Sequence, residues 1–172
     1  MYQNTYRIRR SFVIPFSIDV FLLFILLLLS IFLKGSHVES TTLIIIFIAA
    51  LYVYIESLYR MVQTGDQGIM IRKVLRKKEL RWEDVTHVGA LTLRKKAYLL
   101  LTTVKGFHIL SNAYEKYSSL TTDIISHLDK EKVEEEVRNQ QEHPVKNVSD
   151  IVMTWFTAVV LLGIITIKLF NS

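Results

Sequence analysis

Two carboxylates lie inside long apolar runs of this chain, where an ionisable side chain is costly. Asp19 falls in the run from Phe12 to Leu33, and Glu56 falls in the run from Thr42 to Val62. A charge at the centre of a membrane span costs about 2.5–3.5 kcal/mol on insertion scales, so such residues predict a proton or cation site. The alternative is that Glu56 pairs with Arg60 at i+4 and that Asp19 reaches interfacial water or a basic residue. We favour this alternative, because a transport path needs more than three short helices unless several copies assemble.

Two clusters of cations are the strongest charge signal in the polar part of the chain. The clusters are Arg76-Lys77-Lys78 and Arg94-Lys95-Lys96. Each cation near an anionic leaflet contributes about 1 kcal/mol of attraction, which predicts contact with lipid headgroups. The alternative is that both clusters are solvated turns, whose positive charge reflects only the cytoplasmic location of this segment and not binding to lipid. No aromatic residue alternates with these cations as in a stacking platform, so we do not expect nucleic-acid binding.

The histidines and the acidic pair Glu83-Asp84 lack the spacing that catalysis or metal binding needs. Adjacent residues of a strand point to opposite faces, which separates the two carboxylates of this pair. No phosphate loop, nucleophile elbow or paired-cysteine site is present. The histidines are His37, His87, His108, His127 and His143. We therefore expect no enzyme activity, no metal and no cofactor, and we identify no small-molecule substrate.

Three apolar runs set the organisation of the chain, and the third extends from about Ile151 to Phe170. Each run has about 20 residues, which at 1.5 Å per residue cover a hydrocarbon core of roughly 30 Å. Buried core helices would be shorter and would show a polar face. A secretory signal peptide would also have a shorter apolar run than the first of these. The sequence therefore predicts three transmembrane helices, at about 12–33, 42–62 and 151–170.

The distribution of cations predicts the orientation of these helices. Arg7, Arg9 and Arg10 precede the first run, and the polar segment after the second run is rich in lysine and arginine. The short connection 34–41 holds one lysine against Glu39. By the positive-inside rule, we expect a multi-pass protein of the cell (inner) membrane with the N-terminus and polar segment in the cytoplasm and the C-terminus outside. The absence of cysteine agrees with a reducing compartment.

The polar segment begins with short β-favouring runs separated by turn signals, which indicate a small antiparallel sheet or barrel. The expected strands cover 69–72, a segment entering 80–82, and 85–93, 98–104 and 107–110. Within the longest of them, Val88, Leu91 and Leu93 are the core candidates.

The period of the apolar residues changes after residue 111. Tyr117, Leu120 and Ile124 recur at helical spacing, and Asn112 with Glu115 has the spacing of a capping pair. We expect one amphipathic helix that closes the sheet. The run 129–142 is almost wholly charged or amide, which predicts a solvated helical linker that ends at residue 144.

The stretch Leu80-Arg81-Trp82-Glu83-Asp84-Val85 resembles a segment of bacterial membrane-anchored pleckstrin-homology-like (PH-like) domains. Sequences of that family often contain a hydrophobic-Trp-x-Asp-Ile/Val segment, which Trp82, Asp84 and Val85 match. The order of strands, the basic hairpin and the closing helix are also similar, over about residues 63–130. The resemblance implies a seven-stranded, strongly bent antiparallel sheet capped by one C-terminal helix, and no catalytic residue. A third membrane helix after the domain departs from the common pattern.

The expected fold class is therefore an integral membrane α-helical part plus a cytoplasmic α+β domain, with a PH-like bent sheet or small barrel. Residues 1–62 are expected to form an N-terminal tail and a transmembrane hairpin, and 63–130 the PH-like domain. Residues 131–148 are expected to form a charged linker, and 149–172 the third helix with a short outer tail.

The charge of the polar segment is uneven along the chain. Residues 63–116 hold eleven lysines and arginines against five carboxylates, whereas residues 117–148 hold four against seven. We expect a non-enzymatic interaction module that serves as scaffold or subunit of a membrane complex, with a protein partner or a second copy of the chain. One alternative is a sensor of anionic lipid in the inner leaflet. The second is a small transport or pore component that uses the intramembrane carboxylates.

Overall fold

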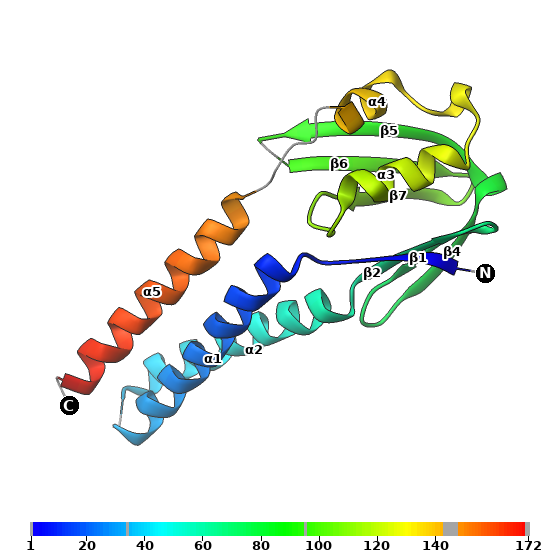
Figure 1. Ribbon diagram of the computed structural model, residues 1–172. Coiled ribbons are helices and arrows are strands. Elements are labelled where there is room, and N and C mark those ends of the chain that lie inside the picture. The colour runs from blue at the N-terminus through cyan, green and yellow to red at the C-terminus, as the bar shows by residue number, and fades with distance from the viewer. Residues whose placement is uncertain (1, 34, 95, 143–147, 171–172) are drawn as a thin grey trace. The chain divides into compact units, whose positions relative to one another are not determined.

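The computed structural model describes residues 2–33, 35–94, 96–142 and 148–170. The chain divides into two compact units (Figure 1). The sheet unit contains Met1–Arg9 and Tyr59–Asn147, and the helical unit contains Arg10–Leu58 and Val148–Ser172. The protein therefore has a mixed α+β fold in which one unit is formed by helices alone.

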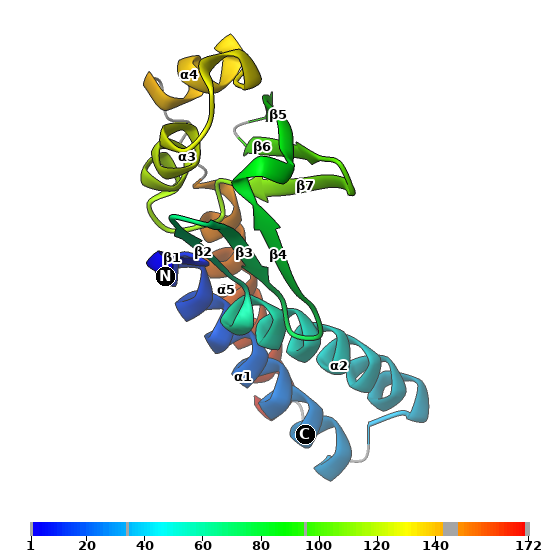
Figure 2. The ribbon, with the colours of Figure 1, turned by 90° about the vertical axis from the view of Figure 1, so that its right-hand side faces the viewer.

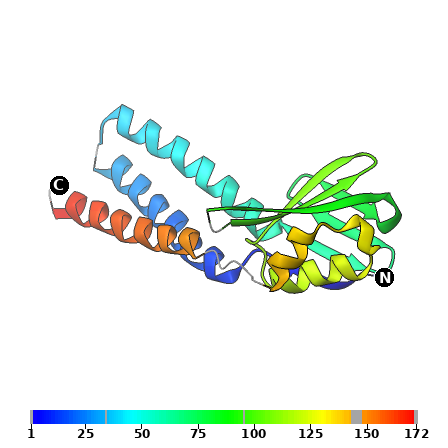
Figure 3. The same cartoon turned by 90° about the horizontal axis from the view of Figure 1, so that it is seen from above.

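The helical unit contains three helices that are long and apolar enough to cross a membrane. They are α1 (Arg10–Phe32), α2 (His37–Tyr59) and α5 (Ser149–Phe170). These three helices confirm the apolar helices expected from the sequence, with ends displaced by a few residues. Figure 3 shows them side by side within their unit.

Helix α1 packs along α5 through aliphatic side chains. The buried cluster consists of Leu22 and Leu26 of α1 and Ala158, Leu161 and Ile165 of α5. Helix α2 contacts α1 through aromatic pairs, and none of its described side chains is buried. The pairs are Phe16–Tyr54 at 6.3 Å and Phe24–Phe47 at 5.7 Å between ring centroids. The exposed side chains of α2 are largely apolar, among them Ile44, Ile45 and Ile48.

A polar link joins the helix ends that are remote from the chain's connections to the sheet unit. The Lys168 ammonium of α5 donates to the carboxylate of Glu39 in the first turn of α2. The hydroxyls of Ser30 and Ser40 lie 3.2 Å apart, which joins α1 to α2. These contacts connect all three helices at one level.

The sheet unit contains two antiparallel sheets. Sheet 1 has the order β1-β2-β3-β4, and sheet 2 has the order β5-β6-β7. The strands are β1 (Tyr2–Arg7), β2 (Met61–Gly65), β3 (Gly68–Arg72), β4 (Lys77–Arg81), β5 (Val85–Leu93), β6 (Lys96–Thr103) and β7 (Gly106–Ser111). Figure 2 shows β4 continuing through the 3₁₀ turn Trp82–Asp84 into β5, so that this turn connects the two sheets.

Strand β1 was not expected, because residues 1–62 were assigned to a tail and a helical hairpin. It pairs with β2 in the register Tyr6 to Val62 and Arg7 to Met61. The partners are more than fifty residues apart in sequence, so no local pattern indicates the pairing. As a result, α1 and α2 are inserted between two neighbouring strands of one sheet.

The core of the sheet unit lies between the inner faces of the sheets and helix α3 (Tyr117–Ser126). Its fully buried apolar side chains include Val62, Ile69, Val85, Val88, Leu99, Leu101, Leu110, Leu120 and Ile124. The expectation for Val88 was right, but the expectations for Leu91 and Leu93 were wrong, because these leucines are 44% and 55% exposed. After the bulge between Val85 and His87, side chains of β5 alternate between the two faces, so Leu91 and Leu93 face away from Val88.

Helix α3 confirms the expected amphipathic helix, but its N-terminus differs from the prediction. The N-cap residue is Lys116, in the left-handed conformation with φ of 54°, and no side chain caps the helix. The expected pair of Asn112 and Glu115 therefore does not cap it. The backbone amide of Glu115 instead donates to the carbonyl of Arg7, 2.7 Å away.

The described part of the expected linker is packed against the sheet rather than solvated. It forms a 3₁₀ turn at Lys130–Lys132 and helix α4 (Glu135–Glu142). The amide of Glu134 donates to the carbonyl of Val88 at 3.0 Å, and the sparse apolar residues Val133 and Val137 are both buried. Burial of these two valines, four positions apart, thus packs an otherwise charged segment against the sheet. The expected end of the linker at Pro144 lies outside the described residues.

Candidate functional site

The first basic cluster surrounds the turn between β3 and β4. The amide of Lys73 donates to the carbonyl of Arg76 at 2.8 Å and closes the turn. Lys77 begins β4 and lies 2.7 Å from the carboxylate of Glu79, and Leu75 at the tip is 83% exposed. The turn therefore presents a leucine surrounded by cations.

The second basic cluster forms the turn between β5 and β6. Arg94 adopts the left-handed conformation with φ of 47°, and Lys96 begins β6 with a partly buried side chain. Lys95, which was predicted with them, lies outside the described residues. Leu93 lies directly before this turn and is more than half exposed.

The β3–β4 turn lies at the end of sheet 1 where the chain leaves for α1 and returns from α2. One row of paired residues crosses this end, from Arg7 through Met61 and Arg72 to Lys77. Helix α1 begins three residues after this row and α2 ends two residues before it. Neighbouring strands are about 4.8 Å apart, so the base of the turn lies within about 15 Å of both connections. We call this end of the sheet unit the junction end.

Hydrogen bonds tie the β5–β6 turn to the junction end as well. The amide of Asn112 donates to the carbonyl of Ala97 at 2.8 Å, two residues after the turn. The amide of Arg9 donates to the carbonyl of Ala113 at 3.0 Å, directly before α1 begins. The described part of the β5–β6 turn therefore lies on the β1 side of the junction end, and the β3–β4 turn lies on its β4 side.

The cations of the β3–β4 turn act on a neighbouring strand. Burial lowers the pKa of His108 in β7, and the positive charges of Lys78 and Lys73 lower it further. The imidazole therefore stays neutral to lower pH than an ordinary histidine. Burial is the larger of these effects, and the two lysines add to it by favouring the neutral imidazole.

The family-like motif of Trp82, Asp84 and Val85 occupies the connection between the two sheets. The Trp82 indole N–H donates to the carbonyl of Gly65 at 2.8 Å, and its ring stacks on His127 at 4.8 Å. Val85 is fully buried, and the backbone carbonyl of Asp84 accepts from the amide of Val104 at 3.1 Å. The described contacts of this motif therefore hold the strands of the two sheets in place.

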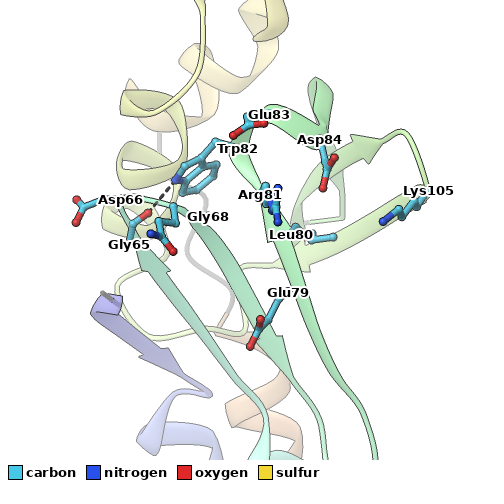
Figure 4. A pocket seen from close by; sticks show the side chains of 11 residues that line it. Gly65, Asp66, Gly68, Glu79, Leu80, Arg81, Trp82, Glu83, Asp84 and Lys105 are labelled. Atoms are coloured by element: carbon cyan, nitrogen blue, oxygen red, sulfur yellow. Dashed lines mark hydrogen bonds between the residues drawn. The ribbon is translucent and has the colours of Figure 1, made fainter.

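A groove of about 1080 Å³ opens beside this motif, at the end of sheet 1 opposite the junction end (Figure 4). Two of its carboxylates are engaged within the protein. Glu79 pairs with Lys77, and Asp66 accepts from the Gln3 amide at 2.9 Å and 3.0 Å. The lining residues are Gly65, Asp66, Gln67, Gly68, Glu79, Leu80, Arg81, Trp82, Glu83, Asp84 and Lys105. In the described parts of the chain, no three His, Cys, Asp or Glu side chains are grouped closely enough to hold a metal ion.

Asp123 of α3 is a polar centre that the sequence did not reveal. One of its carboxylate oxygens accepts from Asn4 Nδ2 at 2.7 Å, Tyr6 Oη at 2.5 Å and Thr64 Oγ1 at 3.0 Å. Burial alone raises the pKa of Asp123. The three hydrogen bonds and the field of His127 outweigh that effect and hold the pKa below its ordinary value. The donors are 59 to 119 positions away in sequence, so no local pattern could indicate this site.

The predicted intramembrane groups have different environments. The Asp19 side chain is 3% exposed, and its Oδ1 atom has no hydrogen-bond partner among the described residues. Glu56 is partly buried in α2. The guanidinium of Arg60 donates to the hydroxyl of Tyr114 at 3.1 Å and lies 5.6 Å from the centre of that ring. Arg60 therefore helps to hold the junction end together.

Comparisons of the chain with known protein families, with curated proteins and with solved structures find no match.

The outer face of sheet 2 is largely apolar and exposed. Leu91 and Leu93 of β5 lie on the same face as Phe107 and Ile109 of β7. The exposed fractions of Phe107 and Ile109 are 71% and 47%. We call these four residues the outer patch. At the edge of β5, the ring of His87 lies 2.7 Å from the carboxylate of Glu134 and marks the polar border of this face.

Proposed function

We propose that this protein is a non-enzymatic, membrane-anchored interaction module with a PH-like sheet unit. Three apolar helices of sufficient length support integration into a membrane. Two antiparallel sheets and the helix α3 support the PH-like assignment, because a bent sheet closed by one helix is what the resemblance implies. In this proposal the N-terminus and sheet unit are cytoplasmic and the C-terminus is outside, as the positive-inside rule favours.

The outer patch is the observation that carries this proposal. Hairpin strands of a soluble sheet normally alternate apolar residues toward the core with polar residues toward water. Leu91, Phe107 and Ile109 break that alternation on a face where the described residues leave them exposed. Contiguous exposed apolar surface rimmed by polar residues is typical of a protein contact site. We therefore assign the outer patch to a partner protein or a second copy of this chain.

The experiment compares the intact protein with a double variant, Phe107→Ser with Ile109→Ser, in native membranes. Lysine-directed cross-linking and mass spectrometry would identify the neighbours, and mass photometry of the solubilised protein would measure its oligomeric state. We expect the double variant to lose at least fivefold in cross-linked partner or in oligomer.

The matched control is Val104→Ser, which removes an apolar side chain that is 74% exposed but lies outside the outer patch. This control should retain the cross-linked neighbours. If the double variant and the control keep the same neighbours in the same yield, the outer patch is not the interaction site.

A second candidate function rests on Asp19. A buried carboxylate with an unpartnered oxygen inside an apolar helix is the kind of group that proton relays use. The test is proton flux into liposomes that contain the purified protein and a pH-sensitive dye. Loss of flux in Asp19→Asn, or in Glu56→Gln, would favour transport. Equal flux in protein-free liposomes would remove this candidate.

A further inference from the structure

The β3–β4 turn has an unusual composition for a solvent-facing hairpin tip. Such tips are normally polar with glycine, proline, asparagine or aspartate. This tip instead presents Leu75, the most exposed leucine among the described residues, between Lys73 and Arg76. An exposed apolar side chain flanked by cations is a poor arrangement for water and a good one for the interface of an anionic bilayer.

The β3–β4 turn lies at the junction end of sheet 1. The row from Arg7 to Lys77 defines the junction end, and the turn extends beyond that row. The chain enters α1 three residues from Arg7, and α2 returns at Tyr59, two residues from Met61. The covalent connections alone therefore hold the turn close to the ends of two apolar helices, whatever the orientation of the units.

The electrostatics of the junction end agree with this placement. The β5–β6 turn adds Arg94 and Lys96 on the side of the junction end where Arg9 and Asn112 lie. Anionic headgroups are the natural counterions for such a cluster next to a membrane.

We propose that the β3–β4 turn docks the sheet unit onto the anionic inner leaflet, with Leu75 entering the interfacial region and the surrounding cations contacting lipid phosphates. The β5–β6 turn contributes a second contact through Arg94. This inference rests on the membrane anchoring in the proposed function but not on the outer patch. A docked sheet unit would be a fixed platform with its distal end directed away from the bilayer.

The chain contains no cysteine, so single labels can test the proposal in the full-length protein. Leu75→Cys carries an environment-sensitive fluorophore at the turn. Val104→Cys carries it at the β6–β7 turn, which is also exposed and is followed by Lys105 but lies at the opposite end of β6. Both proteins are reconstituted into nanodiscs of neutral phosphatidylcholine with or without 30% phosphatidylglycerol and with spin-labelled lipid as quencher.

With phosphatidylglycerol we expect spin-labelled lipid to quench the label at position 75 at least threefold more strongly than the label at position 104. Neutral nanodiscs should remove most of that difference. Neutralising cations by Lys73→Gln with Arg76→Gln should weaken quenching at position 75, whereas Lys105→Gln should leave it unchanged.

Two outcomes would overturn the proposal. Equal quenching at positions 75 and 104 in anionic nanodiscs would place the turn in water. Equal quenching at position 75 in neutral and anionic nanodiscs would exclude anionic lipid as the partner. Thermal unfolding of each labelled protein checks that the sheet unit is folded. Cross-linking through the outer patch is scored separately, so failure of docking and failure of the interaction module are distinguishable.

Discussion

At the scale of single residues, Asp123 is the polar contact that most constrains the sheet unit. Its carboxylate joins α3 to β1 through Asn4 and Tyr6 and to β2 through Thr64. Strand β1 precedes the helical hairpin and β2 follows it, so a single side chain connects segments on both sides of that insertion. Hydrogen bonds to an ionised group are stronger than those between neutral groups, which makes this contact costly to remove.

Replacing this carboxylate should destabilise the sheet unit. We expect Asp123→Ala to lower the free energy of unfolding by about 2 kcal/mol, because three donors lose a charged acceptor. Asp129→Ala is the matched control, since its carboxylate is largely exposed and lies 3.5 Å from Lys132 in a surface pair. That control should change stability by less than about 0.5 kcal/mol. Denaturant unfolding of the full chain in detergent measures both, and equal effects would contradict the prediction.

The same residue predicts a dependence of stability on pH. The pKa of Asp123 is lower in the folded protein than in the unfolded chain, so the folded state favours the ionised form. The resulting stabilisation is complete above the ordinary aspartate pKa of about 3.9 and is lost as the pH falls through the lower folded value. The stability difference between wild type and Asp123→Asn should therefore shrink in acid. A difference that grows as the pH falls would give the wrong sign.

At the scale of elements, alternation and turn signals predicted the strands of sheet 2 and the helix α3, whereas long-range contacts escaped prediction. Strand β5 has the expected bounds, yet Leu91 and Leu93 were predicted to lie in the core. Their apolar side chains favoured that prediction, whereas the alternation of side chains along the strand places them on the exposed face. Strand β1 had no local signal, because its six residues acquire their conformation by pairing with β2. The basic turns were predicted from charge, but their positions in the sheet unit follow only from strand register and from the long-range hydrogen bonds of Arg9 and Asn112. The PH-like assignment itself stays a prediction.

Contact between β3 and β4 gives an element-scale prediction at Gly68. A Cβ atom at Gly68 would lie 2.0 Å from the carbonyl oxygen of Leu80, so any side chain forces the two strands apart. We expect Gly68→Ala to cost about 3 kcal/mol of stability through this overpacking. Gly106→Ala is the control, because its φ of +128° is unfavourable for alanine but nothing lies within 4 Å of its Cβ position. The control should cost about 1 kcal/mol, and thermal unfolding with equal losses would refute the packing argument.

At the scale of the whole molecule, the proposed topology has the sheet unit and the α1–α2 connection on opposite sides of the membrane. A cysteine at His37, the first residue of α2, should react with an impermeant maleimide in intact cells. A cysteine at Lys105, in the β6–β7 turn of the sheet unit, should react only after the membrane is opened. Both positions have exposed side chains, so access to the reagent decides the outcome. Labelling of Lys105→Cys in intact cells would reverse the proposed orientation.

The pairing of β1 with β2 has a consequence for biogenesis. In the proposed topology, the chain between these strands crosses the bilayer twice, and both strands must return to the same compartment before they can hydrogen-bond. If only one of the two helices inserted, β1 and β2 would lie on opposite sides of the membrane, and sheet 1 would lack its edge strand β1. Sheet 1 can therefore form only if the chain between β1 and β2 crosses the bilayer an even number of times, so its formation depends on correct insertion of both helices. A soluble domain whose strands all followed the membrane helices in sequence could form its sheet whether or not both helices had inserted.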